Sequence, residues 1–217
     1  MKKVITVLFF LIVLIVIFGF LFFKENKFKK EYESLNGEKT SNGKKYMKVN
    51  IPKDNPIVYS NYEEIFKVLD GTGIIYFGFP QCPWCRNAVP VLLESAIENG
   101  IDKIYYLNNL EDRDILYLKD GKVVTEKEAK EDYKKLLKKL GDNASIYEGL
   151  EDEGIKRIYY PAVVFVKNGK IIDNVTGTVD SQEDPYVPLT NSQKKELKEK
   201  YNEAISELLV CDVKEKC

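Results

Sequence analysis

Two cysteines of this chain stand in a pattern that can carry redox or metal chemistry. Residues 79–90 read "FPQCPWCRNAVP", and in this stretch Cys82 and Cys85 are separated by Pro83 and Trp84. Such a pair can bind a metal, close a small structural disulfide, or exchange electrons with other thiols. The local motif does not distinguish these possibilities, so the rest of the chain must.

The composition excludes several classes of site. The chain has 217 residues and a formal net charge of -1, so it lacks the basic excess that a dedicated nucleic-acid binder needs to neutralise phosphates. It has no histidine, which removes Cys-His and Ser-His catalysis and histidine-based zinc sites. Any activated cysteine must therefore be activated by other groups.

Two further cysteines, Cys211 and Cys217, lie near the C-terminus. Two close pairs fit a disulfide-permissive compartment or a single four-sulfur zinc site. Zinc is the weaker interpretation, because Pro-Trp makes a poor metal knuckle and the second pair is widely spaced; we predict neither a metal nor a cofactor. For Cys211 and Cys217 we expect a structural disulfide, with a redox pair relaying to Cys82 and free thiols as alternatives.

The first residues predict a membrane anchor. Residues 4–23 contain no charge and are long enough to cross the hydrocarbon core as a helix. No small-residue cleavage site follows, so we expect an uncleaved anchor. Lysines on both flanks leave the orientation undecided by charge alone. We expect the rest of the chain on the extracytoplasmic side of the cell membrane, because long domains cross largely regardless of flanking charge and disulfides persist in oxidising compartments.

Strands and helices alternate around the cysteine pair. The apolar run 74–79 predicts a strand buried on both faces, and the cysteine pair then opens a helix that Asn99-Gly100 ends. Residues 103–108 predict a second, parallel strand. A capping box at Ser60-Glu63 predicts the start of the preceding helix, and another at Thr190-Gln193 predicts the start of the last one.

These patterns divide the chain into four parts. We predict an anchor at 1–23, a juxtamembrane tether at 24–45, a domain at 46–210 with an insertion at about 109–158, and a cysteine-bearing tail at 211–217. The tether is predicted because its residues are almost without apolar side chains. The insertion is too long for a simple connection and should hold a hairpin and a helix of its own.

Over residues 58–210, apart from the insertion, the motifs resemble those of the thioredoxin-like family. "FGFPQCPWC" is similar to the family's strand and redox turn, Pro90 to its kinking helix proline, and "YPAVVFVKNGK" to its cis-proline strand and hairpin. The resemblance implies an α/β thioredoxin-like fold, with a central mixed sheet flanked by helices. Among anchored bacterial members, the plan resembles the bacteriocin-transport-accessory type.

The match to thioredoxin itself departs at several positions. Thioredoxin has Gly-Pro between its cysteines and an aromatic residue before them, whereas this chain has Pro83-Trp84 and Gln81. The Pro-aromatic turn is more similar to that of glutaredoxins. Tyr76 stands where thioredoxin carries a buried acid, so thioredoxin's handling of protons is not expected to carry over directly.

The resemblance also implies site residues. Cys82 and Cys85 should form the redox disulfide, with Cys82 as the attacking thiolate because it lies at the helix amino end. Tyr160 and a cis Pro161 should offer their backbone to an extended peptide. Trp84 either contacts substrate or covers the redox turn.

Arg86 has two interpretations as well, a tuning charge beside the cysteines or an ordinary solvated side chain. As a whole, the chain is predicted to be a membrane-anchored extracytoplasmic thiol–disulfide oxidoreductase. Its partners would be cysteine-containing protein substrates, and the anchor allows a redox partner in the membrane. The alternative is a non-catalytic accessory protein that binds an export or surface partner.

Overall fold

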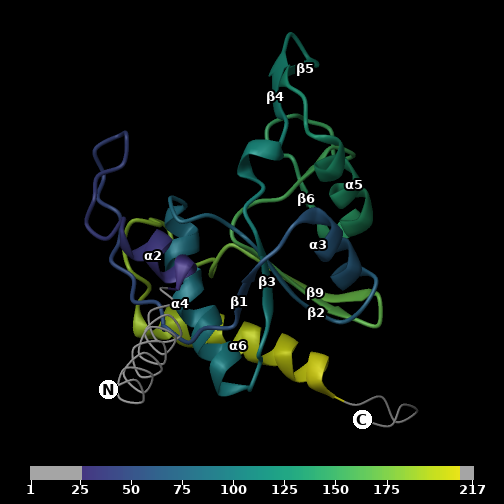
Figure 1. Cartoon of the computed structure of the whole chain (residues 1–217). Coiled ribbons are helices and arrows are strands. Elements are labelled where there is room, and N and C mark those ends of the chain that lie inside the picture. Colours follow the sequence, from purple (N-terminus) through teal and green to yellow (C-terminus); the bar gives the residue numbers. More distant parts are fainter. Residues whose placement is uncertain (1–25, 211–217) are drawn as a thin grey trace, which may run out of the picture.

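The computed structural model describes residues 26–210, so the predicted anchor and the pair Cys211 and Cys217 lie outside the described residues. At its centre is one five-stranded sheet (Figure 1). In spatial order its strands are β1 (Ile57–Tyr59), β3 (Ile104–Leu107), β2 (Gly73–Phe77), β8 (Ala162–Lys167) and β9 (Lys170–Thr176). The first three strands are parallel to one another. Strand β8 pairs antiparallel with β2, and β9 pairs antiparallel with β8. This mixed sheet fits the predicted thioredoxin-like fold.

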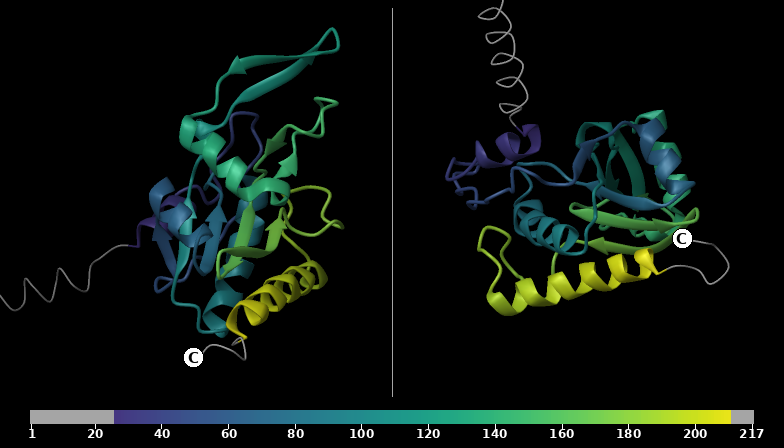
Figure 2. Two further views of the ribbon diagram at one scale, coloured as in Figure 1. Left: turned by 90° about the vertical axis from the view of Figure 1, so that its right-hand side faces the viewer. Right: turned by 60° about the horizontal axis from the view of Figure 1, so that its bottom comes forward.

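Helices cover both faces of the sheet. Helices α2 (Lys27–Glu33), α4 (Pro83–Glu98) and α6 (Asn191–Leu209) pack on one face, and α3 (Tyr62–Leu69) and α5 (Glu131–Leu140) pack on the other (Figure 2). The strands serve both cores because successive side chains point to opposite faces. In β8, for example, Phe165 belongs to the first core, and Val164 belongs to the second. None of the helices within residues 26–210 is long and apolar enough to cross a membrane.

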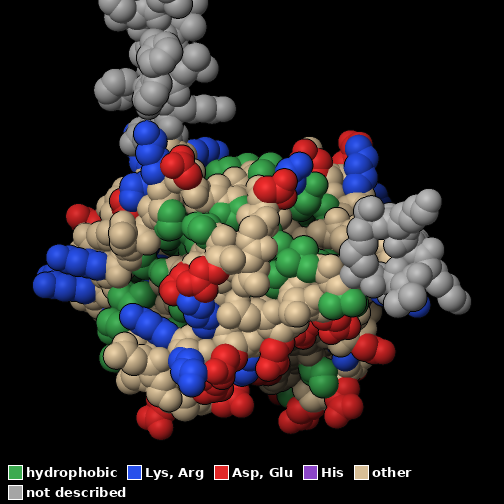
Figure 3. All heavy atoms as spheres, turned by 90° about the horizontal axis from the view of Figure 1, so that it is seen from below, with side chains coloured by type: hydrophobic (Ala, Val, Ile, Leu, Met, Phe, Trp, Pro, Cys, Tyr) green, Lys and Arg blue, Asp and Glu red, His purple; other side chains and the backbone are tan. Residues whose placement is uncertain are grey.

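The surface on the α6 side mixes both signs of charge (Figure 3). Lys198 of α6 bridges two carboxylates of α4, Glu94 at 2.6 Å and Glu98 at 2.8 Å. Exposed pairs of this kind contribute little to stability. The apolar contact between α4 and α6, which includes Leu197 and Tyr201, therefore holds these two helices together.

The insertion has the hairpin and helix that were predicted. Strands β4 (Ile115–Lys119) and β5 (Lys122–Lys127) form a hairpin that extends away from the body (Figures 1 and 2). The turn residues Asp120 and Gly121 both have positive φ, which is the geometry of a two-residue hairpin turn. From the sequence the helix was expected over 126–140, but α5 begins at Glu131 because β5 continues to Lys127. The insertion also holds the short pair β6 (Ser145–Ile146) and β7 (Lys156–Arg157), and the 3-10 turns η1 (Leu110–Asp112) and η2 (Gly141–Asn143).

The helix predicted to start with a capping box at Ser60 begins one residue later. The Asn61 side chain accepts a hydrogen bond from the Glu64 amide at 3.0 Å, and the Glu64 carboxylate accepts one from the Asn61 amide at 2.8 Å. The reason is that Ser60 still belongs to the sheet edge, where its amide donates to the Tyr106 carbonyl. The capping box of α6 at Thr190 is confirmed.

Residues 26–45 differ from the tether that was predicted at 24–45. Asn26 caps α2, whose Phe28 and Tyr32 are completely covered and belong to the main core. The Phe28 ring meets the Tyr106 ring edge-on at 5.1 Å. Two aromatic side chains thus bury an otherwise polar segment, because each removes a large apolar surface from water. The stretch is part of the domain.

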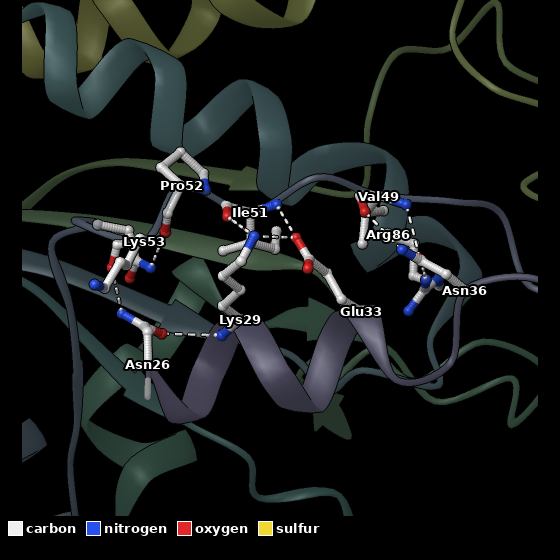
Figure 4. Close-up of polar contacts among 10 residues, drawn as sticks. Asn26, Lys29, Glu33, Asn36, Val49, Ile51, Pro52, Lys53 and Arg86 are labelled. Carbon is white, nitrogen blue, oxygen red and sulfur yellow. Dashed lines mark hydrogen bonds and ion pairs between the residues drawn. The ribbon is translucent and has the colours of Figure 1, made fainter. Parts of the chain in front are cut away.

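Arg86, which directly follows Cys85, holds this segment against α4 (Figure 4). Its guanidinium donates to the Met47 carbonyl at 2.7 and 2.9 Å, to the Tyr32 carbonyl at 2.8 Å, and to Asn36 Oδ1 at 2.6 Å. It also reaches the Pro80 carbonyl at 3.2 Å. Arg86 is fully buried, so the interpretation as a solvated side chain is wrong.

A second set of contacts closes the segment on itself (Figure 4). Glu33 accepts from the Ile51 amide at 2.8 Å and from Lys29 at 2.5 Å, and Lys29 also donates to the Ile51 carbonyl. Asn36 exchanges two hydrogen bonds with the Val49 backbone. The returning chain 47–51 is therefore paired with α2 through side chains, which replace a strand ladder.

Replacing Arg86 with Met should destabilise the whole domain. The side-chain volume is nearly kept, but three buried carbonyls lose their donor, so we expect a loss of about 3 kcal/mol in the free energy of unfolding. Urea unfolding followed by the fluorescence of Trp84 measures it. Lys195→Met is the matched control, because Lys195 is an exposed cation on α6. Equal unfolding midpoints for the two variants would contradict this stabilising role of Arg86.

Candidate redox site

The structure places Cys82 at the amino end of α4, directly after the turn that leaves β2. Cys82 is the N-cap residue, with an extended backbone, and its sulfur accepts a hydrogen bond from the Cys85 amide at 3.1 Å. Pro83 occupies the first helical turn, where its missing amide costs nothing. The cysteine spacing is thus the spacing at which an N-cap side chain meets an amide of the first turn.

Both cysteines are thiols with little solvent exposure. Cys82 is 5% exposed, and Cys85 is completely buried. The Cys82 thiol donates to the Tyr160 carbonyl at 3.7 Å. The peptide bond between Tyr160 and Pro161 is cis, as predicted. The structure therefore brings together the two motifs that lie almost 80 positions apart in the chain.

Tyr160 is held by groups from the insertion and from the redox turn. Its hydroxyl donates to Asn109 Oδ1 at 2.6 Å, and Asn109 is fully buried. Its ring meets Phe79 edge-on at 5.3 Å and lies under the Arg113 guanidinium at 4.7 Å. The carbonyl beside Cys82 is thus fixed from two sides.

The environment lowers the pKa of Cys82. Burial acts in the opposite direction and is the largest single effect, but hydrogen bonds from the Cys85 side chain and from the backbone of Cys85 and Trp84 outweigh it, together with the charge of Arg113. The cation that lowers the pKa of Cys82 is therefore Arg113, while the Arg86 guanidinium donates its hydrogen bonds to carbonyls. A thiolate is the nucleophile in thiol–disulfide exchange, so this environment favours attack by Cys82.

The environment of Cys85 has the opposite effect. Burial raises the pKa of Cys85 well above the ordinary value, and the hydrogen bond and charge of Cys82 raise it further. Cys85 lies one turn inside the helix, where the field of the helix terminus has declined. The two thiols are thus distinguished as an acidic outer one and a neutral inner one.

Trp84 is half-buried and lines a groove of about 500 Å³ beside the redox turn. Tyr160 and Thr178 line the same groove, and so do Ser145 and Glu148 of the insertion. This position supports the interpretation of Trp84 as a substrate contact. The insertion also contributes to the surface that a substrate would meet.

Asn109 and Arg113 were not predicted from the sequence. Both belong to the insertion, for which the motif resemblance offers no counterpart. The one available signal was composition, because arginine occurs only at positions 86, 113 and 157. Such sparse use of arginine in a lysine-rich chain makes each arginine a candidate for a fixed role.

Comparisons with known proteins add little to this description. No protein family and no curated protein matches the chain. Among the solved structures that match, thioredoxin O2 from Arabidopsis thaliana in its oxidised state is similar over 58% of this chain and 85% of its own, with 16% sequence identity and a TM-score of 0.34. The strand order and register given above define the fold.

The role of Arg113 can be tested through the pH dependence of alkylation. Arg113→Met should raise the pKa of Cys82, because it removes a nearby positive charge that favours the thiolate. Below that pKa the rate of reaction with iodoacetamide falls about tenfold per pH unit, so the whole profile should move to higher pH. Arg157→Met is the control, since Arg157 is another insertion arginine that stacks on a tyrosine, Tyr147. Identical profiles for both variants and the parent would refute this role.

Proposed function

We propose that the protein is a thiol–disulfide oxidoreductase whose redox pair is Cys82 and Cys85. The observation that carries the proposal is the asymmetry of the pair: Cys82 is the N-cap of α4, accepts from the Cys85 amide and lies beside the Tyr160 carbonyl, while Cys85 is completely buried one turn further in. This arrangement lowers the pKa of Cys82 and raises that of Cys85. A structural disulfide has no need of such an asymmetry, whereas exchange needs one thiol to attack and another to resolve. The adjoining groove beside Tyr160 and Trp84 supports a protein substrate.

In the reducing direction, the Cys82 thiolate attacks one sulfur of a substrate disulfide and expels the other as a thiolate. Cys85 then loses its proton and attacks the Cys82 sulfur, which releases the second substrate thiolate. The substrate gains two electrons, and Cys82 and Cys85 become a disulfide. The reverse sequence oxidises a substrate dithiol. Both directions use the same contacts, and the direction depends on relative reduction potentials.

The backbone next to Cys82 suits an extended peptide. The Tyr160 carbonyl lies beside the sulfur, and its position is fixed by Asn109 and Phe79. Extended peptides bind strand-like backbone by main-chain hydrogen bonds, with side chains falling into adjoining pockets. In this proposal Trp84, together with Ser145 and Glu148 of the insertion, contacts the residues that flank the substrate cysteine.

Replacing Cys82 and replacing Cys85 should impair the exchange activity in different ways. Cys82→Ser should abolish reduction of insulin by the full chain in detergent, because the attacking thiolate is lost. Cys85→Ser should attack once and accumulate a mixed disulfide with insulin, visible on non-reducing gels. Cys211→Ser with Cys217→Ser should leave the activity unchanged. A folded parent without exchange activity, or complexes linked through Cys85, would sink the proposal.

We further propose that residues 1–23 anchor the protein in the cell membrane and that the domain acts on the extracytoplasmic side. The uncharged run 4–23 and the cysteine pairs support this. Protease added to intact cells should digest a C-terminally tagged chain, while a cytoplasmic marker stays whole. Protection of the tag, with other surface proteins cleaved, would contradict the proposed side.

One observation favours the accessory function. The projecting hairpin β4–β5 exposes Ile115, Tyr117 and Val123 by 37–43% each. Exposed apolar side chains on a protruding element are typical of surfaces that bind other proteins. In this second candidate function the hairpin binds a partner without any redox step, and the exchange assay above separates the two.

A further inference from the structure

The buried thiol Cys85 must become a thiolate before it can resolve a mixed disulfide, yet no base lies near it within residues 26–210. The chain has no histidine, and the adjoining charged side chain, Arg86, donates to carbonyls. The titratable groups that interact with Cys85 are Cys82 of the same turn and five tyrosines from α2, β2, β3, the cis-proline segment and α6, namely Tyr32, Tyr76, Tyr106, Tyr160 and Tyr201. Among the residues described, the surroundings of this thiol are therefore phenolic.

Tyr76 is the tyrosine that lies beside the chain entering the redox turn. It is fully buried in β2, and its hydroxyl lies against Gly78: a Cβ on Gly78 would lie 2.2 Å from the hydroxyl oxygen. Burial and Cys82 raise the pKa of Cys85, and the Phe79 backbone and the Tyr76 side chain act in the opposite direction. Because Gly78 has no Cβ, the Tyr76 hydroxyl has room beside the segment that leads into the redox turn.

Tyr32 completes this arrangement from the N-terminal helix. Its hydroxyl lies 2.7 Å from that of Tyr76, and both side chains are completely buried. The Tyr32 backbone carbonyl is in turn bonded by Arg86, the neighbour of Cys85. Tyr32 therefore contacts the redox helix through its backbone carbonyl and Tyr76 through its hydroxyl.

We propose that the hydroxyl chain from Tyr32 through Tyr76 is a positioning device that donates a hydrogen bond to the Cys85 thiolate during resolution, which makes helix α2 part of the redox centre. The inference rests on the proposed oxidoreductase function. Burial raises the pKa of both tyrosines, so neither can take the proton from Cys85. What a neutral phenol can do is donate, and a hydrogen bond to an ionised acceptor is stronger than one to a neutral acceptor.

The step balances without any further redox group. The Cys85 proton leaves to water, the thiolate attacks the Cys82 sulfur of the mixed disulfide, and the bond between Cys82 and the substrate breaks. The departing substrate thiolate takes a proton from water. The tyrosines keep their protons throughout and only shift their hydrogen bonds toward the sulfur as its charge develops.

Two-step reaction with dithiobis(nitrobenzoate) tests the proposal on the full chain in detergent, with Cys211 and Cys217 replaced by serine. Cys82 releases the first thionitrobenzoate, and attack by Cys85 on the resulting mixed disulfide releases the second. Tyr76→Phe and Tyr32→Phe should leave the first phase unchanged and slow the second by between about threefold and tenfold at pH 7, because the loss of a hydrogen bond to a charge is partly offset by the greater nucleophilicity of a less acidic thiol. The pH profile of the second phase should move to higher pH.

Tyr201→Phe is the matched control, because Tyr201 is buried near Cys85 and its hydroxyl has no hydrogen-bond partner among the residues described. It should behave like the parent. The double variant Tyr32→Phe with Tyr76→Phe should cost less than the product of the single effects, since the two hydroxyls act in series. Each loses only a hydroxyl, and circular dichroism confirms that the variants are folded.

The outcomes separate this inference from the function on which it rests. A parent that releases no second equivalent has no resolving thiol, and the proposed function fails. A parent with two phases whose second phase is unaltered by Tyr32→Phe and Tyr76→Phe overturns the hydroxyl chain alone. Equal slowing by Tyr201→Phe also overturns it, because the effect would then come from core packing.

Discussion

One hydrogen bond, from the Cys85 amide to the Cys82 sulfur, connects the fold to the chemistry. As an N-cap, a neutral thiol is a weak acceptor, whereas a thiolate is a strong one. The same contact therefore starts helix α4 and favours the ionised sulfur. Because the pKa of Cys82 is lowered in the folded state, this contribution to stability is present above the pKa of an unfolded cysteine. It is lost as the pH falls through the folded pKa.

The two thiols need opposite environments, and the three-residue spacing provides them. Cys82 lies where the first-turn amides converge, with Arg113 nearby, while Cys85 is one turn further in and surrounded by the core. The cation that lowers the pKa of Cys82 is Arg113, whereas the guanidinium of Arg86 next to Cys85 donates to carbonyls and to Asn36. The titratable groups around Cys85 on the inner side are phenols, which cost less to bury than ions and still donate. The order of the two chemical steps thus follows from position along one helix.

The sequence predicted those parts of the fold that depend on local patterns. The apolar strand β8, the turn at Asn168 and the cap at Thr190 depend on neighbours within a few positions, and they were found. Residues 26–45 were misjudged because their polar composition outweighs two aromatic side chains, whose partners on β2 and β3, Tyr76 and Tyr106, lie 44 or more positions away. Arg86 was ambiguous for the same reason: its bonds to Met47 and Tyr32 span 39 and 54 positions. Local propensity carries no information on such contacts.

The burial of α2 changes what the proposed anchor implies for the site. A flexible tether of some twenty residues would let the domain sample a wide volume. Instead α2, which Asn26 caps, is already part of the domain, and any chain from position 23 to Asn26 can reach at most about 10 Å. On the proposed anchor at 1–23, the domain is held close to the membrane surface. Arg86 and Tyr32 then connect the membrane-proximal helix directly to the redox helix. Substrates would therefore be proteins whose cysteines come near that surface.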